Sequence, residues 1–271
     1  MTLLQAFVLG LVQGLTEFIP VSSSGHLVLA PRLLGWHFPK EQAFIFDVLV
    51  QMGTLVAVLV YYRHDLAAIT SSFFRGIARR QPFAEADARM GWLLILATLP
   101  AVVIGLLCKD LVEQAFASPK ITGVFLLCTA VLLVIAELAG RRRRSMQDID
   151  WKDSLWIGFS QALALLPGLS RSGATLAGGM TRHLDRPAAA RFSFLMSVPV
   201  MVGAGVLAGK DLLGLHNVSA FLPPLLVGFL TAMISGYIAI RWLISYLSRH
   251  SLHLFAGYCA ALGLTVLLLI R

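Results

Sequence analysis

The chain has 271 residues, of which 58% are hydrophobic and only 13% are charged, and its mean hydropathy is +0.80. Soluble domains carry roughly 25% charged residues, so the composition excludes an ordinary soluble protein and predicts an all-α, polytopic integral membrane protein. The net charge of +8 belongs to the loops and forms no basic patch interleaved with aromatic residues. This indicates contact with the lipid bilayer and its anionic headgroups, and it argues against nucleic acid.

The first apolar segment, residues 3–35, is interrupted by a polar sequence that reads QGLTEFIPVSSSGH over residues 13–26. Gln13 and Glu17 are four residues apart and therefore share one face of a helix. A carboxylate at membrane depth costs roughly 2.5–3.5 kcal/mol. That cost indicates that Glu17 has a partner at depth: a cation, a proton or a buried hydrogen bond. The alternative is a glutamate that lies near the membrane interface, either protonated or snorkelling.

Small hydroxyl residues and a glycine follow Pro20, just before an apolar run, and this order is typical of a helix N-terminus. Free N–H groups and the positive end of the helix dipole suit phosphate oxygens at such a position. The residues of this predicted anion site and its flanking histidine are Ser22, Ser23, Ser24, Gly25 and His26.

Six further segments are near the ~20 residues that a helix needs to cross the hydrocarbon core. They cover residues 44–62, 92–107, 121–136, 192–209, 218–240 and 254–270. Arginine and lysine concentrate in three connecting segments, which the positive-inside rule places in the cytoplasm. These are residues 63–91, 140–153 and 181–191. The loops near 31–43, 109–120 and 210–219 are poorer in basic residues and should face outward.

A second polar interruption reads QALALLPGLSRSGAT over residues 161–175. Adding 148 to the residue number maps the first polar sequence onto it. The matched pairs are Gln13 with Gln161, Ser22 with Ser170, Ser24 with Ser172, and Gly25 with Gly173. Arg171 lies between serines here and favours a bidentate clamp on an oxyanion. The alternative is an arginine paired with a structural carboxylate or with backbone carbonyls.

The loop charges make each polar segment enter and leave the membrane on one side, as a re-entrant helix hairpin. Each half then has one hairpin and three spans, and an odd number of spans inverts the second half relative to the first. We therefore predict a single membrane domain with six transmembrane helices and two re-entrant hairpins. Its inverted-repeat halves are residues 1–140 and 150–271, joined by an Arg-rich cytoplasmic loop. Paired, interrupted segments of this kind indicate a binding site near the midplane.

The two copies complement each other. The residues that differ are Glu17 against Leu165, Ser23 against Arg171, and His26 against Ala174. One half supplies a carboxylate and an imidazole, and the other supplies a guanidinium. An asymmetric site on a symmetric scaffold suits a reaction better than structural packing.

These motifs carry a resemblance to a known family. The run Gln13-x-x-x-Glu17, followed by Pro-Val-Ser-Ser and by Gly25-His26, resembles the first signature of the bacterial undecaprenyl-diphosphatase family, also called the bacitracin-resistance family. The run from Pro167 to Thr175 resembles its second signature, Pro-Gly-x-Ser-Arg-Ser-Gly-x-Thr. Chain length and the re-entrant repeat also match, so the resemblance covers essentially the whole chain. Gln13 replaces the glutamate of some members, which leaves one carboxylate fewer.

The resemblance implies that the protein removes the terminal phosphate of undecaprenyl diphosphate. The product, undecaprenyl phosphate, is the lipid carrier of peptidoglycan synthesis, and this activity confers bacitracin resistance. The resemblance further implies dependence on a divalent cation, Mg²⁺ or Ca²⁺. It places the protein in the bacterial cytoplasmic (inner) membrane, with the active site opening to the periplasmic side.

We assign roles on this basis. The catalytic residues are Glu17, Ser23, His26 and Arg171. The phosphate contacts are Ser22, Ser24, Gly25, Ser170, Ser172, Gly173 and Thr175. Glu17, with Gln13, is expected to hold the cation, because hard cations prefer oxygen ligands. The nucleophile stays open between Ser23, with His26 as base or acid, and a water activated by His26 or by the metal.

The main alternative is a prenyl-lipid flippase or other transporter, because inverted repeats with broken helices also serve alternating access. A carrier needs binding groups only, which Ser23, His26 and Glu17 exceed. Asp47 and Gln51 share a helix face and either line the site or bond two helices together. Glu137, beside Arg141, is expected to snorkel at a cytoplasmic helix end. Homo-oligomerisation is left open.

Overall fold

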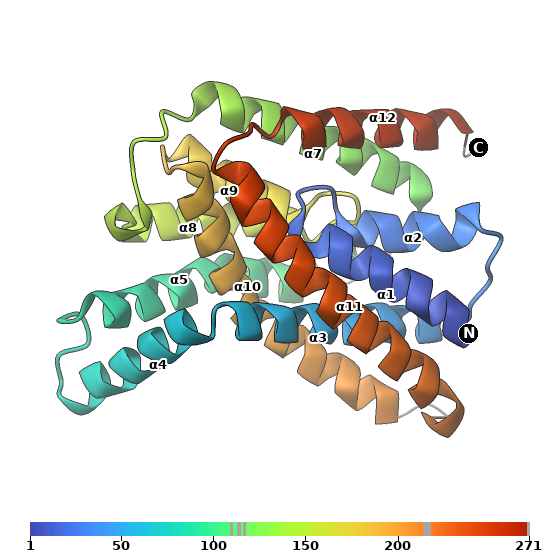
Figure 1. Ribbon diagram of the computed structural model, residues 1–271, viewed down its shortest axis with the longest axis horizontal. Coiled ribbons are helices and arrows are strands. Elements are labelled where there is room, and N and C mark those ends of the chain that lie inside the picture. Colours follow the sequence, from blue (N-terminus) through green and yellow to red (C-terminus); the bar gives the residue numbers. More distant parts are fainter. Residues whose placement is uncertain (109–110, 113–114, 116–117, 214–217, 270–271) are drawn as a thin grey trace.

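The computed structural model describes residues 1–108, 111–112, 115, 118–213 and 218–269, and throughout this part of the chain the regular structure is helical (Figure 1). The helices are α1 (Leu3–Phe18), α2 (Ser23–Leu33), α3 (Lys40–Tyr61), α4 (Arg63–Ala78), α5 (Ala86–Leu107), α7 (Pro119–Ala139), the 3-10 helix η1 (Met146–Asp148), α8 (Trp151–Leu163), α9 (Arg171–Thr181), α10 (Arg186–Leu213), α11 (Val218–Leu247) and α12 (His253–Leu269). The expectation of an all-α protein is confirmed.

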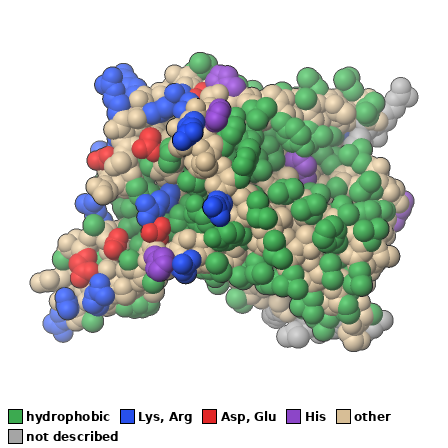
Figure 2. Space-filling model, in the orientation of Figure 1, with side chains coloured by type: hydrophobic (Ala, Val, Ile, Leu, Met, Phe, Trp, Pro, Cys, Tyr) green, Lys and Arg blue, Asp and Glu red, His purple; other side chains and the backbone are tan. Residues whose placement is uncertain are grey.

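Within the described residues, five helices are long and apolar enough to cross a membrane, and they lie in α3, α5, α7, α10 and α11. The sixth predicted span corresponds to α12, whose 17 residues are at the lower end of the spanning range. Large apolar side chains point outward from these helices, as Leu107 (80% exposed) and Leu268 (78% exposed) do. In Figure 2 charged side chains gather at the left end, and hydrophobic side chains cover much of the rest of this face. The protein is therefore a multi-pass membrane protein.

The helices of the two polar segments are short. α1 has 16 residues and α2 has 11, while α8 has 13 and α9 has 11. At 1.5 Å per residue they reach only about 16–24 Å, less than the ~30 Å hydrocarbon core. Short helices joined by a turn suit the predicted hairpins. α2 and α9 begin 148 residues apart, at Ser23 and Arg171, and also end 148 residues apart. The inverted orientation of the two halves stays a prediction.

Each hairpin packs against a helix of the other half. α1 lies along α11, and α8 lies along α5 (Figure 1). Glycines permit both contacts, because a Cβ on Gly10 would lie 2.4 Å from the carbonyl oxygen of Gly228, and one on Gly158 would lie 2.5 Å from that of Ala97. Small residues let membrane helices approach this closely. The two halves are thus interlocked.

From its arginines we expected the segment 63–91 to be a loop. The structure shows that it is not simply one. Its first part forms α4, which starts directly after Tyr62 and packs against α5. α4 buries Ile69, Ser72 and Gly76 and keeps its arginines on the outer face. An amphipathic helix at a membrane surface carries its charges on one face, so counting charges along the segment could not separate it from a loop.

Glu137 does not snorkel, because it is buried near the C-terminal end of α7. Arg186 donates to both of its carboxylate oxygens at 2.7 and 2.6 Å, Arg142 pairs with it, and the backbone N–H of Leu252 donates at 2.8 Å. Arg141, the neighbour on which we based the prediction, is exposed. Glu137 thus joins α7 to the start of α10 and to the α11–α12 connection.

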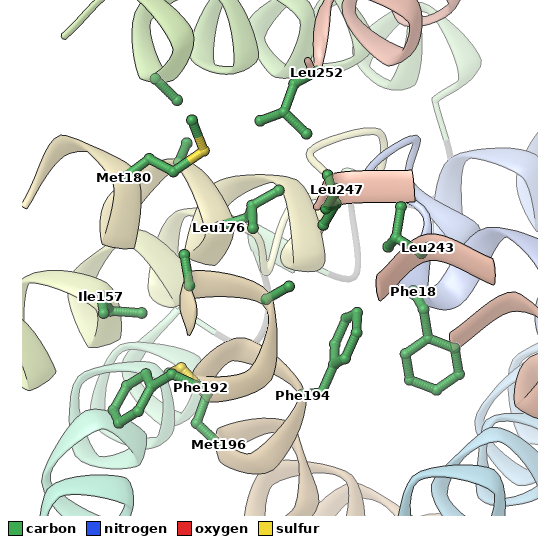
Figure 3. Close-up of a cluster of buried hydrophobic side chains, with 14 of the residues drawn as sticks. Phe18, Ile157, Leu176, Met180, Phe192, Phe194, Met196, Leu243, Leu247 and Leu252 are labelled. Carbon is green, nitrogen blue, oxygen red and sulfur yellow. The ribbon is translucent and has the colours of Figure 1, made fainter. Parts of the chain in front are cut away.

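A cluster of buried apolar side chains lies where α1, α9, α10 and α11 converge (Figure 3). Phe18 ends α1 and meets Phe194 of α10 edge to face, with ring centroids 5.2 Å apart. Both side chains are almost completely buried. Because Phe18 follows Glu17 in the sequence, this packing fixes the position of the carboxylate at the end of α1.

Candidate active site

The two polar loops touch each other. Gly168 adopts a φ of +93°, which favours glycine, and a Cβ there would lie 2.2 Å from the carbonyl oxygen of Thr122. A Cβ on Gly25 would lie 3.3 Å from the Cα of Gly168. The Ser172 hydroxyl donates to the carbonyl of Ile19 at 3.2 Å, which joins the second loop to the first. The expected meeting of the two motifs is therefore present.

Glu17 is the centre of this junction and is only 4% exposed. Its Oε2 accepts hydrogen bonds from Gln13 Nε2 at 2.8 Å and from the Ser23 hydroxyl at 2.6 Å. Its Oε1 accepts from Gln51 Nε2 at 3.1 Å and from Arg171 Nη2 at 2.5 Å. A buried charge is tolerated when it is paired and hydrogen-bonded in this way.

Arg171 is paired with a carboxylate and keeps one guanidinium nitrogen without a partner among the described residues. It is the first residue of α9, and its pair with Glu17 is the carboxylate partner that we considered as the alternative. The carboxylate belongs to the other motif. Arg171 Nη1 is buried and has no hydrogen-bond partner among the described residues. Leaving a buried donor unpaired is costly, so this nitrogen is available for an oxyanion.

The serines of both loops cap their helices. Ser22 Oγ accepts the N–H of Gly25 at 3.2 Å, and Ser170 Oγ accepts the N–H of Gly173 at 3.1 Å. Ser22 has a φ of +72°, which is uncommon for a residue with a side chain. Ser24 Oγ lies 3.3 Å from Ser22 Oγ. Each capping serine therefore satisfies one backbone N–H of its helix start.

The remaining residues of the second motif are held internally as well. Ser172 Oγ lies 3.1 Å from Ser170 Oγ. The Thr175 hydroxyl donates to the carbonyl of Arg171 at 2.8 Å and lies 2.5 Å from Ser193 Oγ. Ser170, Ser172 and Thr175 are all buried. In this arrangement their hydroxyls shape the loop, and the contribution open to a phosphate is the N-terminus of α9.

His26 and Ser23 lie on α2 without a hydrogen bond between them in the described structure. The Ser23 hydroxyl donates to Glu17 instead. His26 Nδ1 lies 2.7 Å from the carbonyl oxygen of Ser22, and Nε2 lies 2.7 Å from the hydroxyl of Tyr258. The carboxylate, rather than the imidazole, is therefore the group next to the candidate nucleophile.

Sequence reasoning left one residue of the site open and missed another. Gln51 was read as either lining the site or bonding two helices, and it donates to Glu17. Tyr258 lies on α12, outside both motifs. The only signal was a tyrosine within an apolar span, since a tyrosine hydroxyl usually needs a partner when it leaves water.

A divalent cation would find a single carboxylate here. The described residues contain no group of three or more His, Cys, Asp or Glu side chains able to hold a metal. Glu17 converges with two glutamine side chains and one serine hydroxyl, and its Oε1 is also paired with Arg171. That donor set suits a cation such as Mg²⁺, which keeps water ligands and binds through one or two carboxylates together with substrate phosphates. It does not suit a cage built wholly from protein ligands.

The fold and the junction define a class: an integral membrane protein in which two polar motifs meet where two short helix hairpins touch. Within that class, the chain belongs to the bacitracin resistance protein BacA family, whose family model matches residues 6–265. The resemblance suggested by the two motifs is therefore confirmed.

Curated relatives match along the full length. An undecaprenyl-diphosphatase of Myxococcus xanthus is 43% identical over 271 residues, which is 100% of this chain and 90% of the relative. One of Chlorobium phaeobacteroides is 42% identical over 288 residues, covering 100% and 98%. One of a Mycobacterium species, strain KMS, is 40% identical over 272 residues, covering 100% and 97%.

Proposed function

We propose that this protein hydrolyses undecaprenyl diphosphate to undecaprenyl phosphate and inorganic phosphate. The observation that carries the proposal is the junction at Glu17, where a serine hydroxyl and an arginine from two separate motifs meet one buried carboxylate. The relatives support the proposal, because they are named undecaprenyl-diphosphatase. Their similarity to this chain extends over nearly the full length of both sequences. The lipid substrate would enter from the bilayer that surrounds the helices.

The site has what phosphoryl transfer requires, which is positioning and neutralisation of charge. Arg171 Nη1 is the free donor for a phosphate oxygen. The N-termini of α2 and α9, which begin at Ser23 and Arg171, supply backbone N–H groups and the positive ends of two helix dipoles. A divalent cation, Mg²⁺ or Ca²⁺, would be held by Glu17 with Gln13 and would neutralise charge on the diphosphate.

Ser23 is the nucleophile that this geometry favours. Its oxygen attacks the terminal phosphorus, its proton passes to Glu17, and the bond to the bridging oxygen breaks to release undecaprenyl phosphate. Water then attacks the phosphoserine, inorganic phosphate leaves, and the serine regains a proton. The 2.6 Å contact between Ser23 and Glu17 supports this route. In the alternative, water attacks directly and Ser23 only positions the phosphate.

The protein would act in the bacterial cytoplasmic membrane, with its site opening to the periplasm. There it would return the peptidoglycan lipid carrier to use and confer resistance to bacitracin. The arginine-rich segments at residues 63–91, 140–153 and 181–191 support an orientation with these segments in the cytoplasm. A flippase acting alone is less well supported, because it would not need a serine hydroxyl hydrogen-bonded to a carboxylate.

The test is phosphate release from a prenyl diphosphate by detergent-purified protein, with Mg²⁺ or Ca²⁺ and then with EDTA. Arg171→Ala should abolish release, because the phosphate loses its guanidinium. Arg143→Ala is the matched control, since Arg143 is exposed in the connection between α7 and α8. Folded wild-type protein that releases no phosphate under any metal condition would contradict the proposal, and lipid transport would be the next assay.

A further inference from the structure

The hydrogen bonds of His26 fix which of its ring nitrogens carries the proton. A backbone carbonyl only accepts hydrogen bonds, so the 2.7 Å contact with the Ser22 carbonyl requires a proton on Nδ1. In the neutral ring, Nε2 is then the unprotonated nitrogen. The 2.7 Å contact between Nε2 and the Tyr258 hydroxyl is therefore one in which the hydroxyl donates and the imidazole accepts.

Tyr258 is brought to His26 by the docking of α12, and the two residues are 232 positions apart in the sequence. Their rings are nearly parallel, with an interplanar angle of 5°. The neighbouring residue, Cys259, is buried, and its thiol lies 3.7 Å from the carbonyl oxygen of Pro20. Two consecutive residues of α12 thus contact the first polar loop, one at its start and one at its histidine.

We infer that Tyr258 is the positioning residue of His26. Its hydroxyl holds the imidazole in the tautomer with the proton on Nδ1, and it keeps Nε2 directed toward α12. The inference rests on the proposed phosphatase function. It adds a second proton-handling pair to the site, His26 with Tyr258, which is separate from the pair of Ser23 with Glu17.

The separation follows from how few hydrogen bonds each group can make. A neutral imidazole has one acceptor nitrogen, and in this structure Tyr258 occupies it. The Ser23 hydroxyl has one proton, and it donates that proton in a hydrogen bond to Glu17. His26 can therefore accept a proton from a water at Nε2 only where that water replaces or shares the Tyr258 contact. A group that reaches Nε2 does so beside the Tyr258 hydroxyl.

The first test reads the tautomer without any activity. Nitrogen-15 NMR of histidine-labelled protein distinguishes a ring protonated on Nδ1 from one protonated on Nε2, and His26→Gln identifies the signals. We expect the Nδ1-protonated form in the wild type. In Tyr258→Phe the Nε2 signal should move, because the donor is lost. Tyr246→Phe, near the C-terminal end of α11, should leave it unmoved. A wild-type ring protonated on Nε2, or an Nε2 signal that Tyr258→Phe does not move, would overturn the inference.

The second test is kinetic. Loss of an outer partner of a functional histidine lowers activity roughly 10- to 100-fold at metal sites, and we expect a fall in kcat of that size for Tyr258→Phe, with KM within about twofold. Cys259→Ala is the matched control on the same helix, because it removes the thiol contact with Pro20 and leaves the tyrosine in place. If Cys259→Ala lowers kcat as much as Tyr258→Phe does, the tyrosine serves only to dock α12.

The two proposals fail in different ways. If the wild type releases phosphate and Tyr258→Phe equals it in kcat, the role of Tyr258 is wrong and the phosphatase function stands. If the wild type releases no phosphate, the proposed function is wrong. The NMR result then still decides whether Tyr258 sets the tautomer of His26.

Discussion

The Glu17 carboxylate accepts hydrogen bonds from side chains on α1, α2, α3 and α9. The four donors therefore come from four separate parts of the sequence. Removing one donor changes the surroundings of the other three, because they share two oxygen atoms. Variants at this site should therefore show coupled, non-additive effects.

Ser23→Ala tests the nucleophile. If Ser23 attacks phosphorus, the variant should lose turnover by at least about 100-fold, in keeping with the contribution of a positioned catalytic group. Acid quenching of wild-type protein with labelled diphosphate should also trap a phosphoserine, and the variant should trap none. Ser71→Ala, on the outer face of α4, is the control. Near-normal turnover by Ser23→Ala would favour direct attack by water.

Glu17→Gln tests the buried ion pair through stability. The change leaves Arg171 partly buried without its counter-charge, and breaking such a pair costs about 3–5 kcal/mol. We expect the free energy of unfolding to fall. The loss should be near the lower end of that range, because the Arg171 side chain is 18% exposed. The double variant Glu17→Gln, Arg171→Met should recover part of the loss. Denaturant unfolding in detergent measures the wild type, Glu17→Gln, Arg171→Met and the double variant. Losses that simply add would contradict the pairing.

At the scale of the helices, close approach is set by glycines. Gly10→Ala would place a methyl group 2.4 Å from the backbone oxygen of Gly228, where no flexible side chain can yield. Overpacking of this kind costs about 1–3 kcal/mol. Gly203→Ala meets nothing within 4 Å and should be neutral or stabilising by up to about 1 kcal/mol, as alanine favours a helix. Thermal unfolding compares the two. Equal shifts would mean that α1 and α11 are not closely packed.

Local sequence predicted much at this scale, and its failures have physical causes. The break at Pro20, the serines at both helix starts and the repeat at an offset of 148 residues are local features, and the structure has α2 and α9 where they indicate. α4 and the burial of Glu137 were not predicted, because both depend on neighbours. In the site, the meeting of the two motifs was predicted, whereas Tyr258 comes from a helix 232 residues further on.

At the scale of the molecule, the hairpin topology makes a prediction about the two membrane faces. Thr2 and Leu34 flank the first hairpin, Arg143 precedes the second, and Lys152 lies in the first turn of the second. After the three native cysteines are replaced, single cysteines at Thr2 and Leu34 should react with a membrane-impermeant maleimide added to intact cells. Cysteines at Arg143 and Lys152 should react only after the cells are opened. Labelling of Thr2 and Leu34 from opposite faces would contradict a re-entrant first hairpin.

The ion pair between Glu17 and Arg171 also has a consequence for synthesis. Its partners are 154 residues apart, and chains grow at about 5–20 residues per second. The carboxylate therefore leaves the ribosome roughly 8–30 s before its guanidinium exists. During that interval the first hairpin must keep Glu17 hydrated or protonated. α11, the helix against which α1 packs, is made later still. The first hairpin can thus take its final place only after most of the protein has been translated.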